Sequence, residues 1–327
     1  MRFPLLLLSA VFTTAGASLH AQPLNAAAAK DFAEYQLFSP QKTFYVAGDG
    51  STNWWAGSSG ETPETAIASG RKRCEDRGKT DCRLHALNNI MLAGRDWKTA
   101  LPPALPAIGR LRVQPWWENK GPQAAAGLIV WSHGYMEGKD ATAGAPQPYV
   151  GRFTAAGYDL YRFDREYIRD WPGDATALAD AVRQAKAMGY RRVILAGQSA
   201  GAWVSMAATL RGAPVDGVIS IAAAHHGYVG RMTDPTRARS DWQQVVRGIK
   251  PGPRLVVVNF AKDDYDVGGR MDDASAAFSA NRVDAEVISD PAGFSGHGAG
   301  NDFAFARKYG ACMQAFIETG ARQPPCS

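Results

Sequence analysis

The pentapeptide Gly197-Gln198-Ser199-Ala200-Gly201 constrains the fold of this chain more than any other feature. It follows residues 193–196, an apolar run whose length and β-branched content are typical of a strand buried on both faces. Residues 202–210, which come next, have the composition of a helix. The chain therefore has to reverse from a buried strand into a helix within a few residues. A central strand of this kind is typical of a parallel sheet covered by helices.

The serine of this pentapeptide is predicted to stand at the tip of the reversal. Such a turn forces its middle residue into a strained conformation, and Gly197 and Gly201 let the strand and helix backbones pass closely. The hydroxyl of Ser199 would then project from the carboxyl edge of the sheet, in front of a helix N-terminus that favours developing negative charge. This context favours a nucleophilic serine over a purely structural turn.

From residue 108 onward, strand-like runs alternate with helical segments. We expect strands at residues 110–114, 127–131, 158–163, 193–196, 215–223, 255–260 and 284–289, and helices at residues 174–188, 202–210, 275–281 and 302–317. Strands separated by helices indicate a mostly parallel sheet with helices on both faces. In such sheets the active site lies at the carboxyl ends of the strands.

Residues 1–21 have the pattern of a secretory signal peptide. Arg2 precedes an apolar stretch, and small residues precede two candidate cleavage points, after Ala17 and after Ala21. No run of 18 apolar residues occurs, so the mature chain is not expected to span a membrane. We therefore expect an exported bacterial protein, either periplasmic or extracellular.

The four cysteines form two local pairs, Cys74 with Cys82 and Cys312 with Cys326. An exported chain meets an oxidising compartment, so two disulfide bonds are predicted. Metal binding is the alternative, but only His85 lies near either pair as a further ligand. The sequence therefore predicts neither a metal nor a cofactor.

The chain is expected to divide at the proline-rich segment 99–106, which has the composition of a stiff linker. Residues 22–98 would form a small cysteine-containing module and residues 108–327 the catalytic domain. Within the module, Thr62 is predicted to cap a helix that begins at Pro63, and residues 49–60 are predicted to be a loop. Its adjacent Trp54 and Trp55 are expected to make core or interdomain contacts rather than a ligand platform.

A serine hydroxyl is a weak nucleophile until a base accepts its proton. His297 is the predicted base, because it lies in a glycine-rich loop between the last strand and the last helix. The other five histidines fit this role less well: His20 in the signal peptide, His85 in the cysteine module, His133 in a predicted oxyanion loop, and His225 and His226 as packing or substrate contacts at the rim of the site.

The base needs an acid to orient its ring. Three aspartates compete for this role after the strand at residues 255–260: Asp263, Asp264 and Asp266. Asp264 is preferred, since the acid commonly stands four residues past the end of the strand.

Acyl transfer also needs donors for the developing oxyanion. The backbone N–H of Ala200, just after the nucleophile, is the first candidate. The second is the N–H of Tyr135, because Gly134 lets the chain turn after the strand at residues 127–131.

The order Ser199, Asp264, His297, with His133-Gly134 ahead of the G-x-S-x-G, resembles the α/β-hydrolase superfamily, and within it the lidless dienelactone-hydrolase-like enzymes and esterases. The resemblance covers residues 108–319. It implies the α/β-hydrolase fold and a serine hydrolase that cleaves a small or oligomeric ester through an acyl-enzyme intermediate. A peptidase or amidase of the same superfamily and a non-catalytic binding protein on the same scaffold are the alternatives.

The net charge of +5 is spread along the chain, without a basic cluster interleaved with aromatic residues, so no nucleic-acid partner is expected. Residues 227–250 are predicted to form a pocket wall or short lid. Basic residues outnumber acidic ones in this insert, which fits either a substrate with negative charge or a solvated surface: Arg231, Arg237, Arg239, Arg247 and Lys250 against Asp234 and Asp241.

Overall fold

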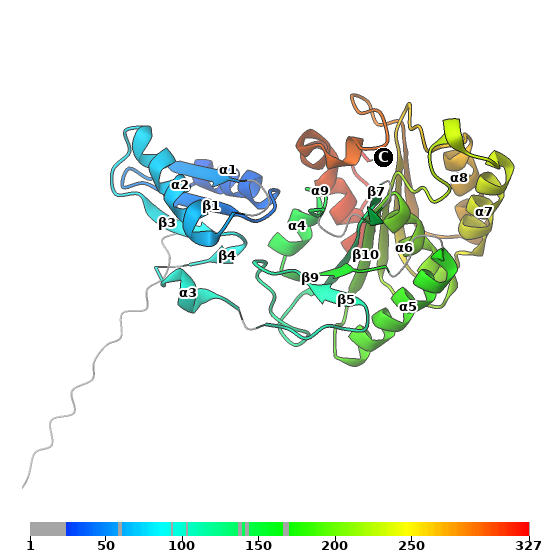
Figure 1. Ribbon diagram of the computed structural model, residues 1–327, viewed down its shortest axis with the longest axis horizontal. Helices are drawn as coiled ribbons and strands as arrows, with labels where there is room; N and C mark the ends of the chain where they lie inside the picture. The colour runs from blue at the N-terminus through cyan, green and yellow to red at the C-terminus, as the bar shows by residue number, and fades with distance from the viewer. Residues whose placement is uncertain are drawn as a thin grey trace, which may run out of the picture.

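Two β-sheets organise the described part of the chain, a small one near the N-terminus and a large one in the remainder (Figure 1). The computed structural model describes residues 24–326, apart from residues 58–60, 93, 103, 137–138, 141–143 and 166–169. The predicted signal peptide lies outside the described residues.

The small sheet is antiparallel, with the strand order β2-β1-β3-β4. Its strands are β1 (Lys42–Val46), β2 (Thr52–Ala56), β3 (Arg83–Leu87) and β4 (Ile90–Met91), and its helices are α1 (Ala26–Gln36), α2 (Pro63–Asp76) and α3 (Trp97–Ala100). Thr62 caps α2 by accepting a hydrogen bond from the N–H of Thr65, as predicted. The Cys74–Cys82 disulfide then ties the end of α2 to the start of β3.

The prediction of an uninterrupted loop at residues 49–60 is wrong. Residues 52–56 form β2, which pairs with β1 from Thr52 opposite Val46 to Ala56 opposite Lys42. The glycines and polar residues of this stretch are typical of a loop, but part of it forms a strand that pairs with the preceding strand β1. The Trp54 ring lies 4.7 Å from that of Phe38, which supports the predicted packing contact.

The large sheet has the strand order β13-β12-β11-β10-β6-β9-β5. All neighbouring strands are parallel except β5, which runs antiparallel to β9, so the predicted mostly parallel sheet is confirmed. The strands are β5 (Leu111–Val113), β6 (Gly127–Ser132), β9 (Tyr158–Phe163), β10 (Val193–Gln198), β11 (Gly217–Ile221), β12 (Arg254–Asn259) and β13 (Ala285–Ser289).

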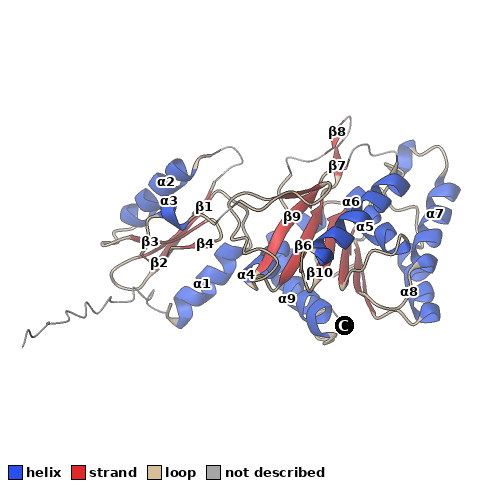
Figure 2. Cartoon of the chain, turned by 90° about the horizontal axis from the view of Figure 1, so that it is seen from below, coloured by secondary structure: helices blue, strands red, loops and turns tan. Residues whose placement is uncertain are grey.

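Alternate residues of the central strand β10 face opposite cores. Val193 and Leu195 belong to one hydrophobic cluster, and Ile194 and Ala196 belong to the other. Helices cover both faces of the sheet (Figure 2). The first cluster includes residues of α5 (Trp171–Ala187), α6 (Ala200–Leu210), α7 (Pro235–Gly248) and α8 (Arg270–Asn281), and the second includes residues of α4 (Val150–Ala155) and α9 (Phe303–Thr319). Burial on both faces explains why β10 is an uninterrupted apolar run before the glycine.

The prediction that residues 227–250 form a pocket wall or lid holds only for their first few residues. A short 3-10 helix, η1 (Val229–Arg231), is followed by α7, whose Trp242, Val245 and Val246 are buried in the core. The basic residues of α7 lie on its exposed side. Because these residues are frequent in the sequence of the helix, it was predicted to be a surface segment.

The N-terminal part packs directly on α4 and α9, the helices on one face of the large sheet. Leu37 joins the cluster formed with α4 and α9, and the Phe38 ring stacks on that of Phe303 at 4.1 Å. Glu34 and Arg307 form an ion pair, with Nε 2.7 Å from Oε1. The second disulfide, Cys312–Cys326, joins α9 to the C-terminal turn.

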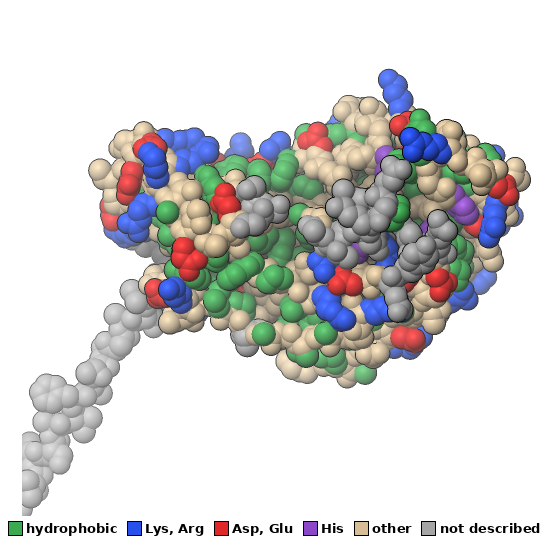
Figure 3. All heavy atoms as spheres, in the orientation of Figure 1, with side chains coloured by type: hydrophobic (Ala, Val, Ile, Leu, Met, Phe, Trp, Pro, Cys, Tyr) green, Lys and Arg blue, Asp and Glu red, His purple; other side chains and the backbone are tan. Residues whose placement is uncertain are grey.

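No helix among the described residues is long and apolar enough to cross a membrane. Side chains of both charges are interspersed on the face drawn in Figure 3.

Candidate active site

Ser199 stands at the sharp turn between β10 and α6. Its φ of 56° and ψ of −123° are strained for a residue with a side chain. Two glycines make the turn sterically feasible. A Cβ on Gly201 would lie 1.9 Å from the carbonyl oxygen of Ser132, and one on Gly197 would lie 2.5 Å from the carbonyl carbon of Gly201. The strand, turn and helix predicted around the pentapeptide are therefore confirmed, with boundaries shifted by two residues.

Two hydrogen bonds join Ser199, His297 and an aspartate in a continuous chain. Nε2 of His297 lies 2.8 Å from Oγ of Ser199, and Nδ1 lies 2.9 Å from Oδ1 of Asp263. The Asp263 side chain is completely buried, whereas 18% of the His297 side chain is exposed. A serine, an imidazole and a buried carboxylate in this order have the geometry needed to move a proton from the hydroxyl to the ring.

The structure places Asp263, and not the predicted Asp264, against the histidine. Asp264 is exposed, and its backbone carbonyl accepts a hydrogen bond from the N–H of Val229. Strand β12 ends at Asn259, one residue earlier than expected. The predicted spacing of four residues past the strand therefore leads to Asp263.

Backbone pairing continues beyond the end of β12 and sets the position of Asp263 relative to His297. Ala261 forms a parallel bridge with Ser295, and the N–H of Gly296 donates to the carbonyl of Ala261 at 2.7 Å. This contact brings the loop before His297 alongside the loop before Asp263.

The third candidate acid, Asp266, is occupied elsewhere. Its Oδ2 accepts from the amide of Asn259 at 2.5 Å, and its Oδ1 lies 3.3 Å from Nε of Arg270. Only 2% of Arg270 is exposed, and its guanidinium also donates to the carbonyls of Ala223 and Tyr265. Asp266 thus helps to compensate a buried cation.

The predicted oxyanion loop lies beside the turn at Ser199. It follows β6 and leads into a small hairpin of β7 (Tyr135–Met136) and β8 (Lys139–Asp140). A Cβ on Gly134 would lie 2.3 Å from Oε1 of Gln198 and 3.6 Å from Cβ of Ser199, so Gly134 lies close to the serine turn. Ala200 is the first residue of α6, where the backbone N–H has no partner within the helix.

Arg165, which no sequence pattern singled out, also contacts this loop. It follows β9 by two residues and is 7% exposed. Its Nη1 donates to the carbonyl of His133 at 2.7 Å, and its Nη2 donates to the carbonyl of Gly134 at 2.9 Å. No local pattern connects Arg165 with residues 32 positions earlier in the chain.

The strand order places the serine turn after the central strand β10, with the aspartate after β12 and the histidine after β13. The chain has the α/β-hydrolase fold. This arrangement confirms the predicted fold class, with the antiparallel four-stranded sheet and its disulfide as an addition at the N-terminal end.

Solved structures with a similar chain path are distant in sequence. A truncated carbohydrate esterase from gut microbiota is 14% identical, with a TM-score of 0.48, and the match covers 64% of this chain and 90% of that one. Thermogutta terrifontis esterase 2 is 14% identical, with a TM-score of 0.46 and coverage of 67% and 98%. The acylaminoacyl peptidase of Pyrococcus horikoshii is 14% identical, with a TM-score of 0.45 and coverage of 59% and 37%. No protein-family model matches the sequence, and no curated protein matches it either.

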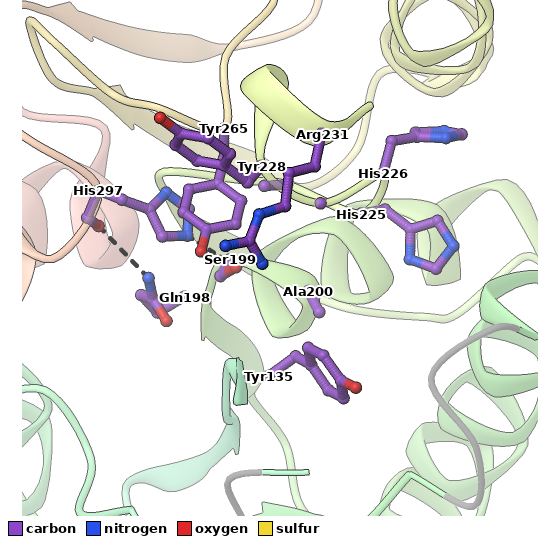
Figure 4. A pocket seen from close by; sticks show the side chains of 12 residues that line it. Tyr135, Gln198, Ser199, Ala200, His225, His226, Tyr228, Arg231, Tyr265 and His297 are labelled. Atoms are coloured by element: carbon purple, nitrogen blue, oxygen red, sulfur yellow. Dashed lines mark hydrogen bonds between the residues drawn. The ribbon is translucent and has the colours of Figure 1, made fainter. Parts of the chain in front are cut away.

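A pocket of about 510 Å³ opens above Ser199 in this α/β-hydrolase fold (Figure 4). Tyr135 and Ala200, the two predicted oxyanion donors, line the pocket together with Ser199 and His297. The other lining residues come mainly from the loop after β11, with Tyr265 from the loop after β12: Gln198, Ala224, His225, His226, Gly227, Tyr228, Arg231 and Tyr265. Among the described residues, no group of three or more His, Cys, Asp or Glu side chains is arranged to hold a metal ion.

Tyr265 contacts both Asp263 and His297. Its ring lies 4.1 Å from the His297 ring, at an angle of 30°, and its backbone N–H donates to Oδ1 of Asp263 at 2.9 Å. Tyr228 packs edge-on against the Tyr265 ring at 6.0 Å. The imidazole is therefore held by a hydrogen bond in its plane and by an aromatic ring on its face.

His225 and His226 lie at the pocket rim, as predicted, and no hydrogen bond joins them to Ser199. The ring of His225 lies 5.9 Å from that of Trp203 and 6.1 Å from that of Trp171. Burial, followed by the nearby His226 and Arg165, lowers the pKa of His225 to about 4. His225 is thus neutral at ordinary pH.

The basic residues of the insert have different environments. Arg231 lines the pocket, whereas Arg239 pairs with Asp273 and Arg237 lies 3.7 Å from Asp241. Basic residues outnumber acidic ones in this insert, but Arg231 is the only one of its basic residues among the described residues that line the pocket.

Proposed function

We propose that this chain is an exported serine hydrolase that cleaves carboxylic esters through an acyl-enzyme intermediate. One observation carries the proposal: the hydrogen-bonded chain from Oγ of Ser199 through His297 to the buried Asp263, at the floor of an open pocket. A binding protein would not require a strained serine at this point, and strain of this kind is typical of a site where chemistry occurs.

In the first half-reaction, Oγ of Ser199 attacks the ester carbonyl while Nε2 of His297 accepts the hydroxyl proton. The imidazolium formed is stabilised by the carboxylate of Asp263. The negative charge on the former carbonyl oxygen is stabilised by the backbone N–H groups of Ala200 and Tyr135. When the tetrahedral intermediate collapses, the bond to the alcohol breaks, and His297 returns the proton to the leaving alkoxide.

In the second half-reaction, water takes the place of the alcohol. His297 accepts a proton from the water as its oxygen attacks the acyl carbon. Collapse of the second tetrahedral intermediate breaks the bond to Ser199 and releases the carboxylic acid. The proton on His297 returns to the serine oxygen, so the free enzyme is regenerated.

The two disulfide bonds support the localisation part of the proposal. Disulfides persist in oxidising compartments and are rare in the cytosol of most bacteria. Together with the signal-peptide pattern at residues 1–21, they favour the periplasm or the surrounding medium.

The test is labelling of the purified mature chain with a fluorophosphonate probe, which reacts with activated serines. We expect the wild type to be labelled and the Ser199→Ala and His297→Ala variants to be silent. Ester and amide substrates matched in their acyl groups then test the bond that is cleaved. A folded wild type that resists labelling would exclude the serine-hydrolase proposal, and faster turnover of amides than of esters would replace esterase by peptidase or amidase.

A further inference from the structure

Arg165 binds two consecutive carbonyl groups of the oxyanion loop. Nη1 donates to His133 and Nη2 donates to Gly134, at 2.7 and 2.9 Å. Nη2 also lies 3.0 Å from Nδ1 of His133. The same ring nitrogen lies 2.9 Å from the carbonyl oxygen of Gly134, to which it would have to donate, whereas a guanidinium can only donate, so Nδ1 takes part in only one of these two hydrogen bonds.

The burial of this charge makes the contact strong. Only 7% of Arg165 is exposed, and a buried cation is costly unless its N–H groups are hydrogen-bonded. Hydrogen bonds from a charged donor are about twice as strong as neutral ones. Rotation of either loop carbonyl away from Arg165 would therefore weaken the compensation of a buried charge.

The carbonyl of Gly134 and the N–H of Tyr135 belong to the same peptide group. This peptide is trans, so the two groups point in opposite directions. The carbonyl faces Arg165, and the other side of Gly134 lies against the serine turn. A Cβ built on Gly134 would be 2.3 Å from Oε1 of Gln198 and 3.6 Å from Cβ of Ser199. By holding the carbonyl, Arg165 also fixes the direction of the Tyr135 N–H.

We propose that Arg165 is a positioning residue for the oxyanion hole: it holds the peptide between Gly134 and Tyr135 so that its N–H faces the substrate carbonyl at Ser199. This inference rests on the proposed hydrolase function. Arg165 is not among the described residues that line the pocket, so it acts through the loop rather than by contact with substrate.

The experiment compares Arg165→Met and Arg165→Lys with a matched control, Arg162→Met. Arg162 lies in β9, three residues before Arg165, and is a partly exposed arginine that pairs with Asp164. Loss of one oxyanion donor costs about 10²–10³-fold in kcat. We expect kcat for an ester to fall about 100-fold in Arg165→Met, with KM within about threefold of the wild type. The kcat of Arg165→Lys should lie between those of the wild type and Arg165→Met. The kcat of the control, Arg162→Met, should remain within about twofold of the wild type.

A trifluoromethyl ketone, which adds to the serine and presents an oxyanion, separates positioning from a general structural effect. Its inhibition constant should rise in Arg165→Met by about the same factor as kcat/KM falls. All rates are divided by the concentration of sites that react with fluorophosphonate, so a partly unfolded sample does not imitate the effect. Added guanidinium ion should partly restore kcat in Arg165→Ala.

Two results would overturn the inference: kcat per active site unchanged in Arg165→Met, or a lower kcat with unchanged affinity for the ketone. If Arg165→Met does not fold, the same comparison is made with Arg165→Lys. A wild type that neither turns over esters nor reacts with the probe would instead refute the proposed function, so the two failures are distinguishable.

Discussion

Nδ1 of His297 and the backbone N–H of Tyr265 share one oxygen of Asp263, each at 2.9 Å. Among the described residues the other carboxylate oxygen has no hydrogen-bond partner, and the side chain is completely buried. The carboxylate is therefore oriented by the residue whose ring also covers the imidazole. This arrangement leads to distinct expectations for Asp263, its neighbour Asp264 and Tyr265.

Replacement of Asp263 by asparagine is expected to lower kcat by about 10³–10⁴-fold. The amide retains the shape of the side chain but neither stabilises the imidazolium nor selects the correct tautomer of His297. Steady-state ester hydrolysis provides the measurement. Asp264→Asn is the control, and we expect it to remain within about threefold of the wild type. The reverse order of effects would restore Asp264 as the acid.

Removal of the Tyr265 ring is expected to reduce kcat modestly. Aromatic pairs contribute about 0.5–1.5 kcal/mol beyond the area they bury, which corresponds to a loss of about fivefold in Tyr265→Ala. The backbone N–H that binds Asp263 is retained in this variant. Tyr265→Phe preserves the ring and should stay within about twofold. Equal losses in both variants would assign the effect to the hydroxyl instead of the stacked ring.

An alanine at Gly201 should destabilise the fold, although alanine normally favours a helix by up to about 1 kcal/mol over glycine. The new Cβ would lie 1.9 Å from the carbonyl oxygen of Ser132, and the backbone on both sides is packed in the core. We expect a loss of about 2–3 kcal/mol in the free energy of unfolding, measured with urea.

Gly298→Ala is the matched control for this substitution. The φ of Gly298 is −91°, and the nearest atom to an added Cβ is 3.7 Å away. Its free energy of unfolding should equal that of the wild type within about 0.5 kcal/mol. A Gly201→Ala variant as stable as this control would contradict the close approach of the turn to β6.

Stability should decrease as the pH falls from about 6.5 to about 4, in part because of His225. Its folded-state pKa is lowered to about 4 by burial, so the unfolded chain binds this proton first and is favoured in acid. At pH 5 this histidine should reduce the free energy of unfolding by about 2 kcal/mol relative to pH 7.5. Urea unfolding of the wild type and His225→Asn at both pH values measures the difference. Identical pH dependence in the two proteins would exclude this contribution.

Local sequence determined most elements of the large sheet and the position of Ser199, the candidate nucleophile. Strand β10 and the turn after it could be predicted because their causes lie within a few residues: an apolar run and two glycines around Ser199. The cap at Thr62 and the two disulfides were predictable for the same reason. The choice of His297 also followed from chain order, since its loop comes after the last strand.

Only the tertiary structure decided which aspartate contacts His297 and which side chain supports the proposed oxyanion loop. Asp263 and Asp264 are adjacent aspartates, and the difference between them depends on where β12 stops pairing with β13 and on the bridge from Ala261 to Ser295. Arg165 contacts a loop more than 30 residues earlier in the chain. Contacts between segments distant in sequence depend on strand register and packing, and no local pattern records them.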